Sequence, residues 1–409
     1  MPPPRHDGLF DRIASFQALL AAAARAVRGK RQKPGAAAFM ANLEPNLLRL
    51  ERTLLDGTWK PGRYVEIELF DPKHRIVSAA PFRDRVVHHA LCAVVEPIFE
   101  QGFIAHSFAN RAGKGTHRGI AAFERYRDRH RFVLRCDIWR YFPAIDHAIL
   151  KRDLRRRIAC ARTLDVLDRV IDGSNPQEPV NLYFPGDDLF EPFERRRGLP
   201  IGNLTSQFFG NVHLDGLDHF ATEVLRAPYV RYVDDFALFA DDRDVLEQWR
   251  AAIAGWLTRR RLVLHPRKTF IAATADPARF LGFDLLPGGR RRLPAENVDR
   301  FRGRLRSLRD RWRRGRVERE DVDRRIGAWV AHARHADTWR LRAAIFRDGW
   351  FDPSGEPPRG PCRSPVAACC AAVPGTTIRG TPAPPTATGT PPGTTTTTSV
   401  SASPARPAA

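Results

Sequence analysis

Residues 229–239 read Tyr-Val-Arg-Tyr-Val-Asp-Asp-Phe-Ala-Leu-Phe, with two adjacent carboxylates between two apolar runs. The runs Tyr229–Val230 and Phe236–Phe239 predict two strands, so Asp234 and Asp235 are expected at the tip of a β-hairpin. Adjacent carboxylates repel each other, and a tight turn holds them only at a cost unless divalent cations or basic groups neutralise them. The hairpin therefore predicts a metal site.

A third acid occurs upstream in a similar setting. Residues 132–138 form an apolar, strand-like run that delivers Asp137 near its end. Three carboxylates on two strands can hold two Mg²⁺ ions roughly 3.5–4 Å apart, an arrangement that serves phosphoryl transfer. We therefore expect Asp137, Asp234 and Asp235 to meet, with Mg²⁺ as the cofactor and Mn²⁺ as an alternative.

The charge of the chain indicates a polyanionic partner. The 409 residues contain 67 Lys and Arg against 46 Asp and Glu, a formal net charge of +21. Residues 352–409 hold few charged side chains, so nearly all of the excess belongs to residues 1–351. Such a body predicts binding to nucleic acid. Its length predicts two or three linked subdomains.

Other features of the composition indicate the cellular setting. The six cysteines form no CxxC pair, which favours a reducing compartment. The N-terminus lacks the apolar centre of a signal peptide, and no segment approaches the roughly 20 apolar residues that span a bilayer. We expect a cytoplasmic protein without a membrane partner.

Apolar spacing predicts several elements. Helices are expected at residues 16–27 and 43–54, alternation predicts strands between 64 and 85, and a further helix follows at 85–99. A stripe at Val298, Phe301, Leu305, Leu308 and Trp312 predicts a helix whose other faces are crowded with arginine, and a second helix follows at 322–333. Residues 352–409 are rich in Pro, Thr, Ala and Gly, which predicts disorder.

A small-residue loop precedes another predicted helix. Residues 198–207 read Gly-Leu-Pro-Ile-Gly-Asn-Leu-Thr-Ser-Gln, and Thr205 or Ser206 is expected as the N-cap. The helix carries an apolar face at Phe209, Val212, Leu217 and Phe220. Small residues before a helix allow a flat ligand to approach the backbone.

The order of strand with Asp137, loop and helix at 198–220, and acidic hairpin resembles the palm of a reverse transcriptase. Further resemblances, in family order, lie at residues 82–87, 107–116, 137–142, 265–269 and 280–283. The resemblance implies an α+β right-hand polymerase that combines an N-terminal helical extension (1–60), fingers (61–130), a palm with an antiparallel sheet and helices on one face (131–290), a helical basic thumb (291–351) and a disordered tail (352–409).

The resemblance also implies roles for individual residues. Asp137, Asp234 and Asp235 would be the catalytic metal ligands, and Phe142 would be the steric gate against a ribose 2′-hydroxyl. The expected nucleotide-binding residues are Lys73, Arg75, Phe142, Ile201, Gly202, Gln207 and Lys268, with Arg83 and Arg85 as competitors for the fingers role. The expected primer grip is Phe280, Leu281, Gly282 and Phe283. The expected contacts to the nucleic-acid backbone are Arg300, Arg302, Arg304, Arg306, Arg309 and Arg313.

Ile201 narrows the subclass. Most reverse transcriptases carry glutamine before the glycine of this loop, whereas Ile201 precedes Gly202 here, which resembles the error-prone enzymes of diversity-generating retroelements. The expected partners are template RNA, primer or cDNA, and deoxynucleoside triphosphates, with an accessory protein subunit left open. The alternatives are a group II intron-like or unclassified stand-alone reverse transcriptase, and a non-catalytic RNA-binding splicing cofactor.

Overall fold

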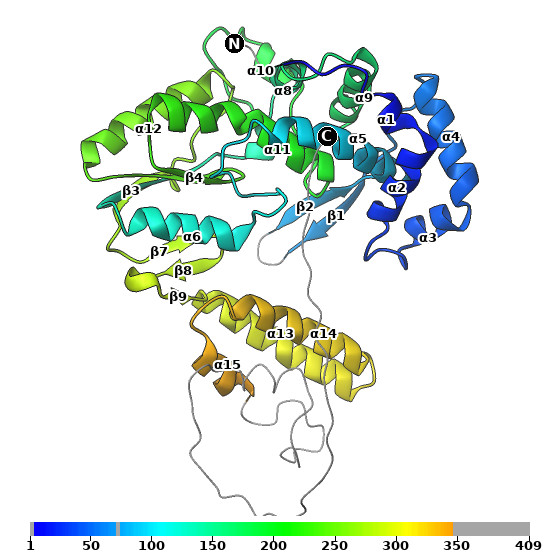
Figure 1. Ribbon diagram of the computed structural model, residues 1–409. Helices are drawn as coiled ribbons and strands as arrows, with labels where there is room; N and C mark the ends of the chain where they lie inside the picture. The colour runs from blue at the N-terminus through cyan, green and yellow to red at the C-terminus, as the bar shows by residue number, and fades with distance from the viewer. Residues whose placement is uncertain (1–3, 71–73, 347–409) are drawn as a thin grey trace, which may run out of the picture.

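The computed structural model describes residues 4–70 and 74–346 (Figure 1). Its first four helices are α1 (Asp11–Ala14), α2 (Phe16–Ala26), α3 (Pro34–Ala41) and α4 (Leu43–Leu55). They gather around the long helix α5 (Phe82–Glu100) at one side of the molecule. Helix α4 buries Leu47, Leu50 and Leu54 at spacings of three and four, which is the predicted amphipathic pattern.

A two-stranded antiparallel hairpin leads into α5. It consists of β1 (Val65–Leu69) and β2 (Arg75–Ala79), with Val65 opposite Ala79 and Leu69 opposite Arg75. Helix α6 (Thr116–Arg127) follows α5 and precedes the main sheet.

The main sheet has four antiparallel strands in the order β4-β5-β3-β6. The strands are β3 (Phe132–Asp137), β4 (Tyr229–Tyr232), β5 (Asp235–Ala240) and β6 (Phe270–Ala273). Strand β3 is central and pairs with β5 from Phe132 opposite Ala240 to Asp137 opposite Asp235. Because β4 and β5 are joined by two residues, the acidic pair falls at one end of the sheet.

Both faces of this sheet are covered. Leu134 and Leu238 belong to the core shared with helices α11 (Leu204–His219) and α12 (Arg243–Thr258), whereas Val133 and Phe239 pack on the opposite side with Phe123 of α6. Alternating side chains of a strand point to opposite faces, so apolar residues at consecutive positions require two cores.

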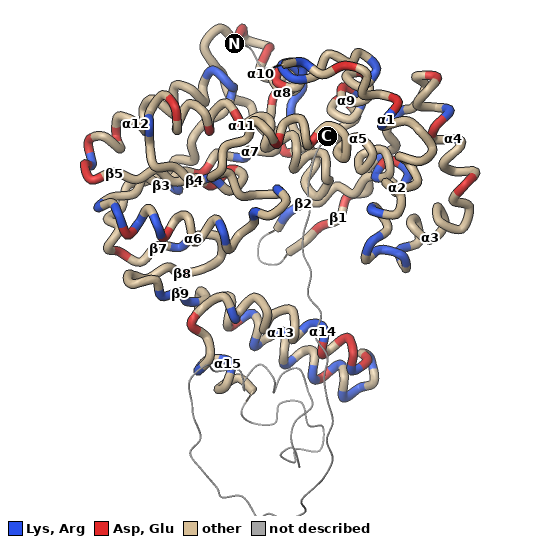
Figure 2. The backbone as a smooth tube through the Cα atoms, viewed as in Figure 1, with Lys and Arg blue, Asp and Glu red and all other residues tan. Residues whose placement is uncertain are grey.

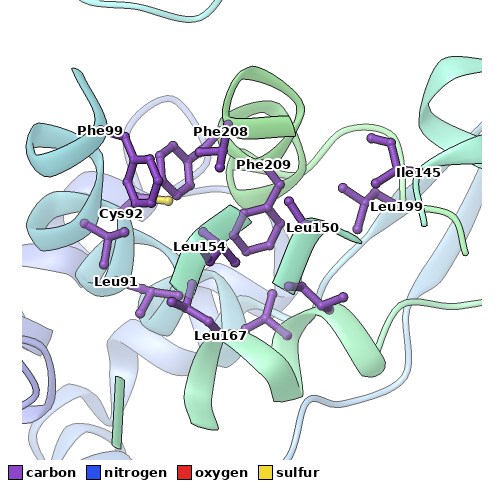
Figure 3. Close-up of a cluster of buried hydrophobic side chains, with 14 of the residues drawn as sticks. Leu91, Cys92, Phe99, Ile145, Leu150, Leu154, Leu167, Leu199, Phe208 and Phe209 are labelled. Carbon is purple, nitrogen blue, oxygen red and sulfur yellow. The ribbon is translucent and has the colours of Figure 1, made fainter. Parts of the chain in front are cut away.

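The main core joins the sheet to the helices around it. Short helices α7 (Tyr141–Ala144), α8 (His147–Arg155), α9 (Ala161–Asp172) and α10 (Glu191–Glu194) connect β3 to α11, and the π-helix η1 (Phe220–Val224) extends α11. Figure 3 shows Phe99, Phe208 and Phe209 packed together with the leucines around them. The Phe99 and Phe208 rings meet edge to face with centroids 5.5 Å apart.

A small sheet and a helical hairpin complete the described chain. Strands β7 (Ala278–Phe280), β8 (Phe283–Leu285) and β9 (Arg291–Arg292) form the sheet, with η2 (Pro287–Gly289) before β9. Helices α13 (Ala295–Arg313) and α14 (Arg319–Ala333) pack around a Phe301–Trp329 ring stack with centroids 3.7 Å apart, and α15 (Trp339–Phe346) follows. In Figure 1 this unit lies on the other side of the sheet from α11 and α12.

The expected α+β class is confirmed, and so is the arginine-rich helix, whose apolar stripe is buried at Val298, Phe301, Leu305 and Leu308. Two details differ. Helices cover both faces of the sheet, because α6 occupies the face left open in the prediction. Asn203, rather than Thr205 or Ser206, is the N-cap of α11, because the helix begins at Leu204.

The predicted tail at 352–409 lies outside the described residues. Within the described ranges, no helix is long and apolar enough to cross a membrane.

Candidate active site

The strand register brings the predicted carboxylates together. Asp137 at the end of β3 is the direct cross-strand partner of Asp235 at the start of β5. Directly opposed residues of an antiparallel pair have Cβ atoms about 4.5–5.5 Å apart on the same face. Asp234 lies in the two-residue turn between β4 and β5, and its carbonyl oxygen accepts a hydrogen bond of 3.2 Å from the Ile138 backbone amide. Three carboxylates therefore meet at one end of the sheet.

Burial and mutual repulsion destabilise the charged forms of these acids. Burial, with added repulsion from Asp137 and Asp235, raises the pKa of Asp234 to about 6. Burial also raises the pKa of Asp235 to about 6, opposed by Arg135 and reinforced by Asp137. Nearby negative charge favours the protonated form of a carboxyl group, so the cluster has a deficit of positive charge.

Two basic side chains partly fill that deficit. The Lys268 Nζ atom lies 2.8 Å from Asp137 Oδ2, and an Arg135 Nη2 nitrogen lies 3.5 Å from Asp235 Oδ1. The loop that carries Lys268 is fixed because the His265 amide donates a hydrogen bond of 2.7 Å to the Asp137 carbonyl oxygen. Lys268, one of the expected nucleotide-binding residues, thus contacts one of the three predicted metal-binding carboxylates directly.

Arg135 was missing from the predicted site. Its position two residues before Asp137 on one strand is a usable signal, because residues i and i+2 share a face. The Arg135 guanidinium also donates to the Arg279 carbonyl oxygen, which connects the acidic end of the main sheet to β7.

The donor set suits a hard divalent cation, because carboxylate oxygens are the ligands that Mg²⁺ and Mn²⁺ prefer. Within residues 4–70 and 74–346, however, no three His, Cys, Asp or Glu side chains are arranged as a ready-made metal-binding group. Asp137 and Asp235 are instead in contact with Lys268 and Arg135. The residues fit the cations chemically, provided that the half-exposed Lys268 releases Asp137.

A buried ion pair supports the turn that carries the acids. Arg231 and Asp218 are both fully buried, and Arg231 donates from Nε and Nη2 to the two Asp218 oxygens at 2.6 Å each. The Arg231 Nη1 group donates at 3.1 Å to the carbonyl oxygen of Val233, whose φ of 58° is unusual for a β-branched residue. Although burial alone would lower it, Asp218 raises the pKa of Arg231. Arg231 therefore stays charged beneath the turn.

The loop before α11 contacts the β1–β2 hairpin. Gly202 has a φ of 106°, and a Cβ atom there would lie 2.5 Å from Val77 Cγ1, so only glycine fits. The Ser78 backbone amide donates to the Ile201 carbonyl oxygen at 3.0 Å, and the Asn203 side-chain amide (Nδ2) donates to the Ser78 carbonyl oxygen at 2.8 Å. These bonds fix the hairpin on the loop that was expected to bind the nucleotide.

Phe142 and Gln207 lie close to this loop. Phe142 is half-buried on α7, its carbonyl oxygen accepts a hydrogen bond of 2.9 Å from the Leu199 amide, and its ring lies beside Gly210 of α11. Gln207 is half-buried in the first turn of α11. The ring position is compatible with both the steric-gate role and simple packing against the core.

The expected fingers cations differ in their settings. Lys73 lies outside the described residues, and Arg75 is exposed at the turn end of the β1–β2 hairpin. Arg83 and Arg85 donate to the carbonyl oxygens of Lys60 and Ala80, at 3.0 and 2.8 Å. Arg75 is therefore the better-placed candidate for contact with a triphosphate.

The expected primer grip is the β7–β8 hairpin. Phe280 and Phe283 are buried cross-strand partners, so they hold the hairpin in the core. Leu281 and Gly282 form its two-residue turn with φ values of 47° and 85°. If this hairpin contacts a primer, the turn rather than the phenylalanines is the accessible part.

The α13 arginines face outward. Arg300, Arg302, Arg304, Arg306 and Arg313 are exposed and Arg309 is half-buried. Figure 2 marks basic positions in blue along the backbone of α13.

Comparison with known proteins agrees with this geometry. A family model described as "Reverse transcriptase (RNA-dependent DNA polymerase)" matches residues 64–285. Protein YkfC of Escherichia coli (strain K12) is 26% identical over 292 residues, which cover 61% of this chain and 73% of that protein. The group II intron-encoded protein LtrA of Lactococcus lactis subsp. cremoris is 21% identical over 314 residues, which cover 59% of this chain and 50% of LtrA.

The chain thus spans only half the length of LtrA. Among solved structures, telomerase from Candida albicans in complex with a fragment of telomeric RNA aligns with a TM-score of 0.41 and 14% identity, over 70% of this chain and 55% of that one. The family match covers more than half of the sequence and includes all three carboxylates. The chain belongs to the reverse transcriptase family.

Proposed function

We propose that this protein is an RNA-directed DNA polymerase that copies an RNA template into cDNA from deoxynucleoside triphosphates. The observation that carries the proposal is the register of β3 and β5, which pairs Asp137 with Asp235 beside Asp234. Uncompensated carboxylates near phosphate are repulsive, so a pure RNA binder has no use for three of them at one end of a sheet.

Asp137, Asp234 and Asp235 would hold the divalent cations, Mg²⁺ or Mn²⁺, which would activate the primer 3′-hydroxyl and neutralise phosphate charge. Other residues of the chain would position the substrate around these carboxylates. Lys268 neutralises Asp137 and, being half-exposed on a flexible stem, can reach a phosphate oxygen instead. The Gly202 loop packs against Val77 and so holds the β1–β2 hairpin in place.

In this proposal residues 1–60 are a helical extension, 61–130 the fingers, 131–290 the palm and 291–351 the thumb. Arg75 and Lys73 of the fingers serve the triphosphate, Phe142 selects against ribose, and residues 280–283 contact the primer. The arginines of α13 contact the nucleic-acid backbone through charge, which makes binding dependent on salt.

The test is primer extension on an RNA template with Mg²⁺ and deoxynucleotides. Wild-type protein is expected to extend the primer, and Asp234→Ala is expected to abolish extension while retaining the fold by circular dichroism. Asp276→Ala is the matched control, because Asp276 is an exposed acid outside the cluster. Extension by Asp234→Ala at the wild-type rate would refute the assignment of the site.

For the subclass we propose the error-prone enzyme of a diversity-generating retroelement. Ile201 supports this, because an apolar side chain before Gly202 removes a hydrogen-bond partner near the incoming nucleotide, a loss worth on the order of 1 kcal/mol of discrimination. The expected result is misincorporation concentrated opposite template adenines, restored toward normal by Ile201→Gln. Equal error rates at all four template bases would exclude this subclass.

A group II intron-type role is the second candidate, favoured by the similarity to LtrA. Neighbouring DNA separates the two. A pair of near-identical repeats that differ mainly at adenines supports the retroelement, whereas flanking intron sequence supports a protein that assists splicing.

A further inference from the structure

A second basic site lies away from the carboxylates. Residues of helices α5, α8, α11 and α12 and of the turns after α8 and α12 line an open cavity of about 670 Å³. Five arginines line it: Arg152, Arg156, Arg157, Arg259 and Arg260. In Figure 1, α8, α11 and α12 lie on one side of the main sheet and α13 and α14 on the other. The helices that line the cavity therefore lie across the main sheet from the arginine-rich helix α13.

One of the two acids of this cavity is already engaged. Asp153 accepts a hydrogen bond of 3.0 Å from Arg260 Nη1, and its other oxygen lies 3.4 Å from His213 Nδ1. The Asp215 Oδ1 atom lies 3.5 Å from His219 Nε2 and is buried without a hydrogen-bond partner. The remaining guanidinium groups thus outnumber the carboxylates left to neutralise them.

Three of these arginines have unused donors. Within the described part of the chain, the side chains of Arg152, Arg157 and Arg259 make no hydrogen bond or ion pair, and Arg156 reaches Asp153 only at 3.9 Å. Arg156 and Arg259 are the C-cap residues of α8 and α12. The helix dipole favours one cation at each such end, but it does not explain why two helix ends direct several arginines at one cavity.

The spacing fits an extended polyanion better than a single phosphate ion. Arg152 and Arg156 are one helical turn apart, about 5.4 Å along the axis, and Arg259 approaches from a different helix. Trp256 is a half-buried part of the cavity wall, where its ring stacks with Phe220 and lies 5.5 Å from the Arg260 guanidinium. Guanidinium groups bind phosphate oxygens in a fork geometry, which suits successive phosphodiesters.

We propose that this cavity binds the phosphodiester backbone of an RNA segment outside the copied duplex. The choice of RNA as the polyanion rests on the proposed function. The cavity is separated by helices α11 and α12 from the end of the main sheet that carries the three carboxylates. An RNA strand held in the cavity is therefore a flanking part of the template or a structured RNA region. The contact would retain the RNA while the primed end moves through the active site.

The test compares two RNAs with the full-length protein. One is a minimal primer–template, and the other carries a long unpaired extension beyond the same duplex. The triple variant Arg152→Gln/Arg156→Gln/Arg259→Gln changes only exposed side chains. It is expected to weaken binding of the long RNA by about tenfold or more and to reduce its salt-dependence slope by about 2, as expected for three lost single-strand phosphate contacts.

The matched control is Arg12→Gln/Arg49→Gln/Arg52→Gln, which removes the same charge from exposed positions on α1 and α4. The control is expected to bind the long RNA within about twofold of wild type. If both triple variants lose the same affinity for the long RNA, the effect comes from overall charge. If the cavity variant keeps the wild-type affinity, the cavity has no role in RNA binding. Either result overturns the proposal.

Inorganic phosphate serves as the competing small anion. If the cavity variant loses binding of inorganic phosphate but binds the long RNA as wild type does, the cavity is a site for free phosphate and the assignment to RNA is wrong. Binding is measured without nucleotides, so these results do not depend on polymerisation. A protein that retains long RNA through the cavity but never extends a primer would refute the proposed function alone.

Discussion

At the residue scale, the charge of Arg231 determines how the acidic turn is held. A guanidinium that is fully buried must be paired, and Asp218 pairs it through two hydrogen bonds while the Tyr229 hydroxyl donates to the same carboxylate at 2.9 Å. The remaining nitrogen holds the Val233 carbonyl oxygen next to Asp234. The pair therefore links the β4–β5 turn that carries Asp234 to α11.

Breaking this pair on one side should be costly. Asp218→Asn leaves a buried positive charge without its counterion, so the free energy of unfolding should fall by about 3–5 kcal/mol in urea titrations. The double variant Arg231→Met/Asp218→Leu removes both charges and should lose much less stability. Its primer extension should still be impaired, because the Val233 carbonyl has lost its donor. If Asp218→Asn is as stable as wild type, the Arg231–Asp218 pair does not stabilise the fold.

The sequence could predict some of these residues but not others. The acidic motif and the strand before Asp137 identify the three carboxylates from local pattern alone. Lys268 on Asp137 and Asp218 under Arg231 depend on contacts 131 and 13 residues apart in the chain. Such pairings depend on the packing of the whole domain, and the spacing of apolar residues in the sequence does not predict them.

At the scale of elements, the junction of the β1–β2 hairpin with the Gly202 loop is the most constrained contact near the site. The predicted small-residue loop is present, but the role of Asn203 is not that of a simple cap. Its side chain forms hydrogen bonds with the backbone of Ser78 in β2 and of Ala80 just after β2, and none with the first turn of α11. The N-cap preferences of single residues cannot predict a hydrogen-bond partner that lies more than 120 residues away in the sequence.

Gly202→Ala tests this junction. The added methyl group would meet Val77 and would hold an alanine at positive φ, so the free energy of unfolding should fall by roughly 1–3 kcal/mol. Gly202→Ala/Val77→Ala should recover only the steric part. Thermal or urea denaturation of the two variants separates clash from backbone strain, and identical stability of wild type and Gly202→Ala would contradict the described conformation.

A histidine stack connects α6 to the end of α14. The rings of His117 and His335 lie with centroids 3.4 Å apart, and burial, followed by the charges of His335 and His332, lowers the pKa of His117. Arg291 also acts on His117 in the same direction, and Arg291 is itself paired with Glu124. The folded protein thus favours the neutral form of the His117 ring.

The consequence is a pH-dependent stability. A histidine with a lowered folded pKa contributes stability that is complete above its unfolded value near 6.5 and is lost as the pH falls below it. The melting temperature should therefore drop between pH 7.5 and pH 5.5. His117→Phe/His335→Phe keeps aromatic packing without the charges and should show a smaller drop. An unchanged pH response in that variant would assign the effect to other groups.

At the scale of the whole molecule, positive charge occupies two separated regions of a single fold. The α13 arginines lie on one side of the main sheet and the helices that line the cavity lie on the other (Figure 1), with the acidic cluster at the end of the sheet. The net charge of the sequence predicted a nucleic-acid partner. It could not predict two surfaces, because the cavity arginines come from α8 and from the end of α12, which only the tertiary fold brings together.

The central claim is that three carboxylates, from β3, the β4–β5 turn and the start of β5, bind divalent cations for polymerisation. The most direct measurement is Mn²⁺ binding by electron paramagnetic resonance, with RNA template, a primer ending in a dideoxynucleotide and the matching nucleotide. Wild type and Asp276→Asn should bind Mn²⁺ alike, whereas Asp137→Asn/Asp234→Asn/Asp235→Asn should lose the protein-dependent signal. Unchanged Mn²⁺ affinity in the triple variant would contradict the account.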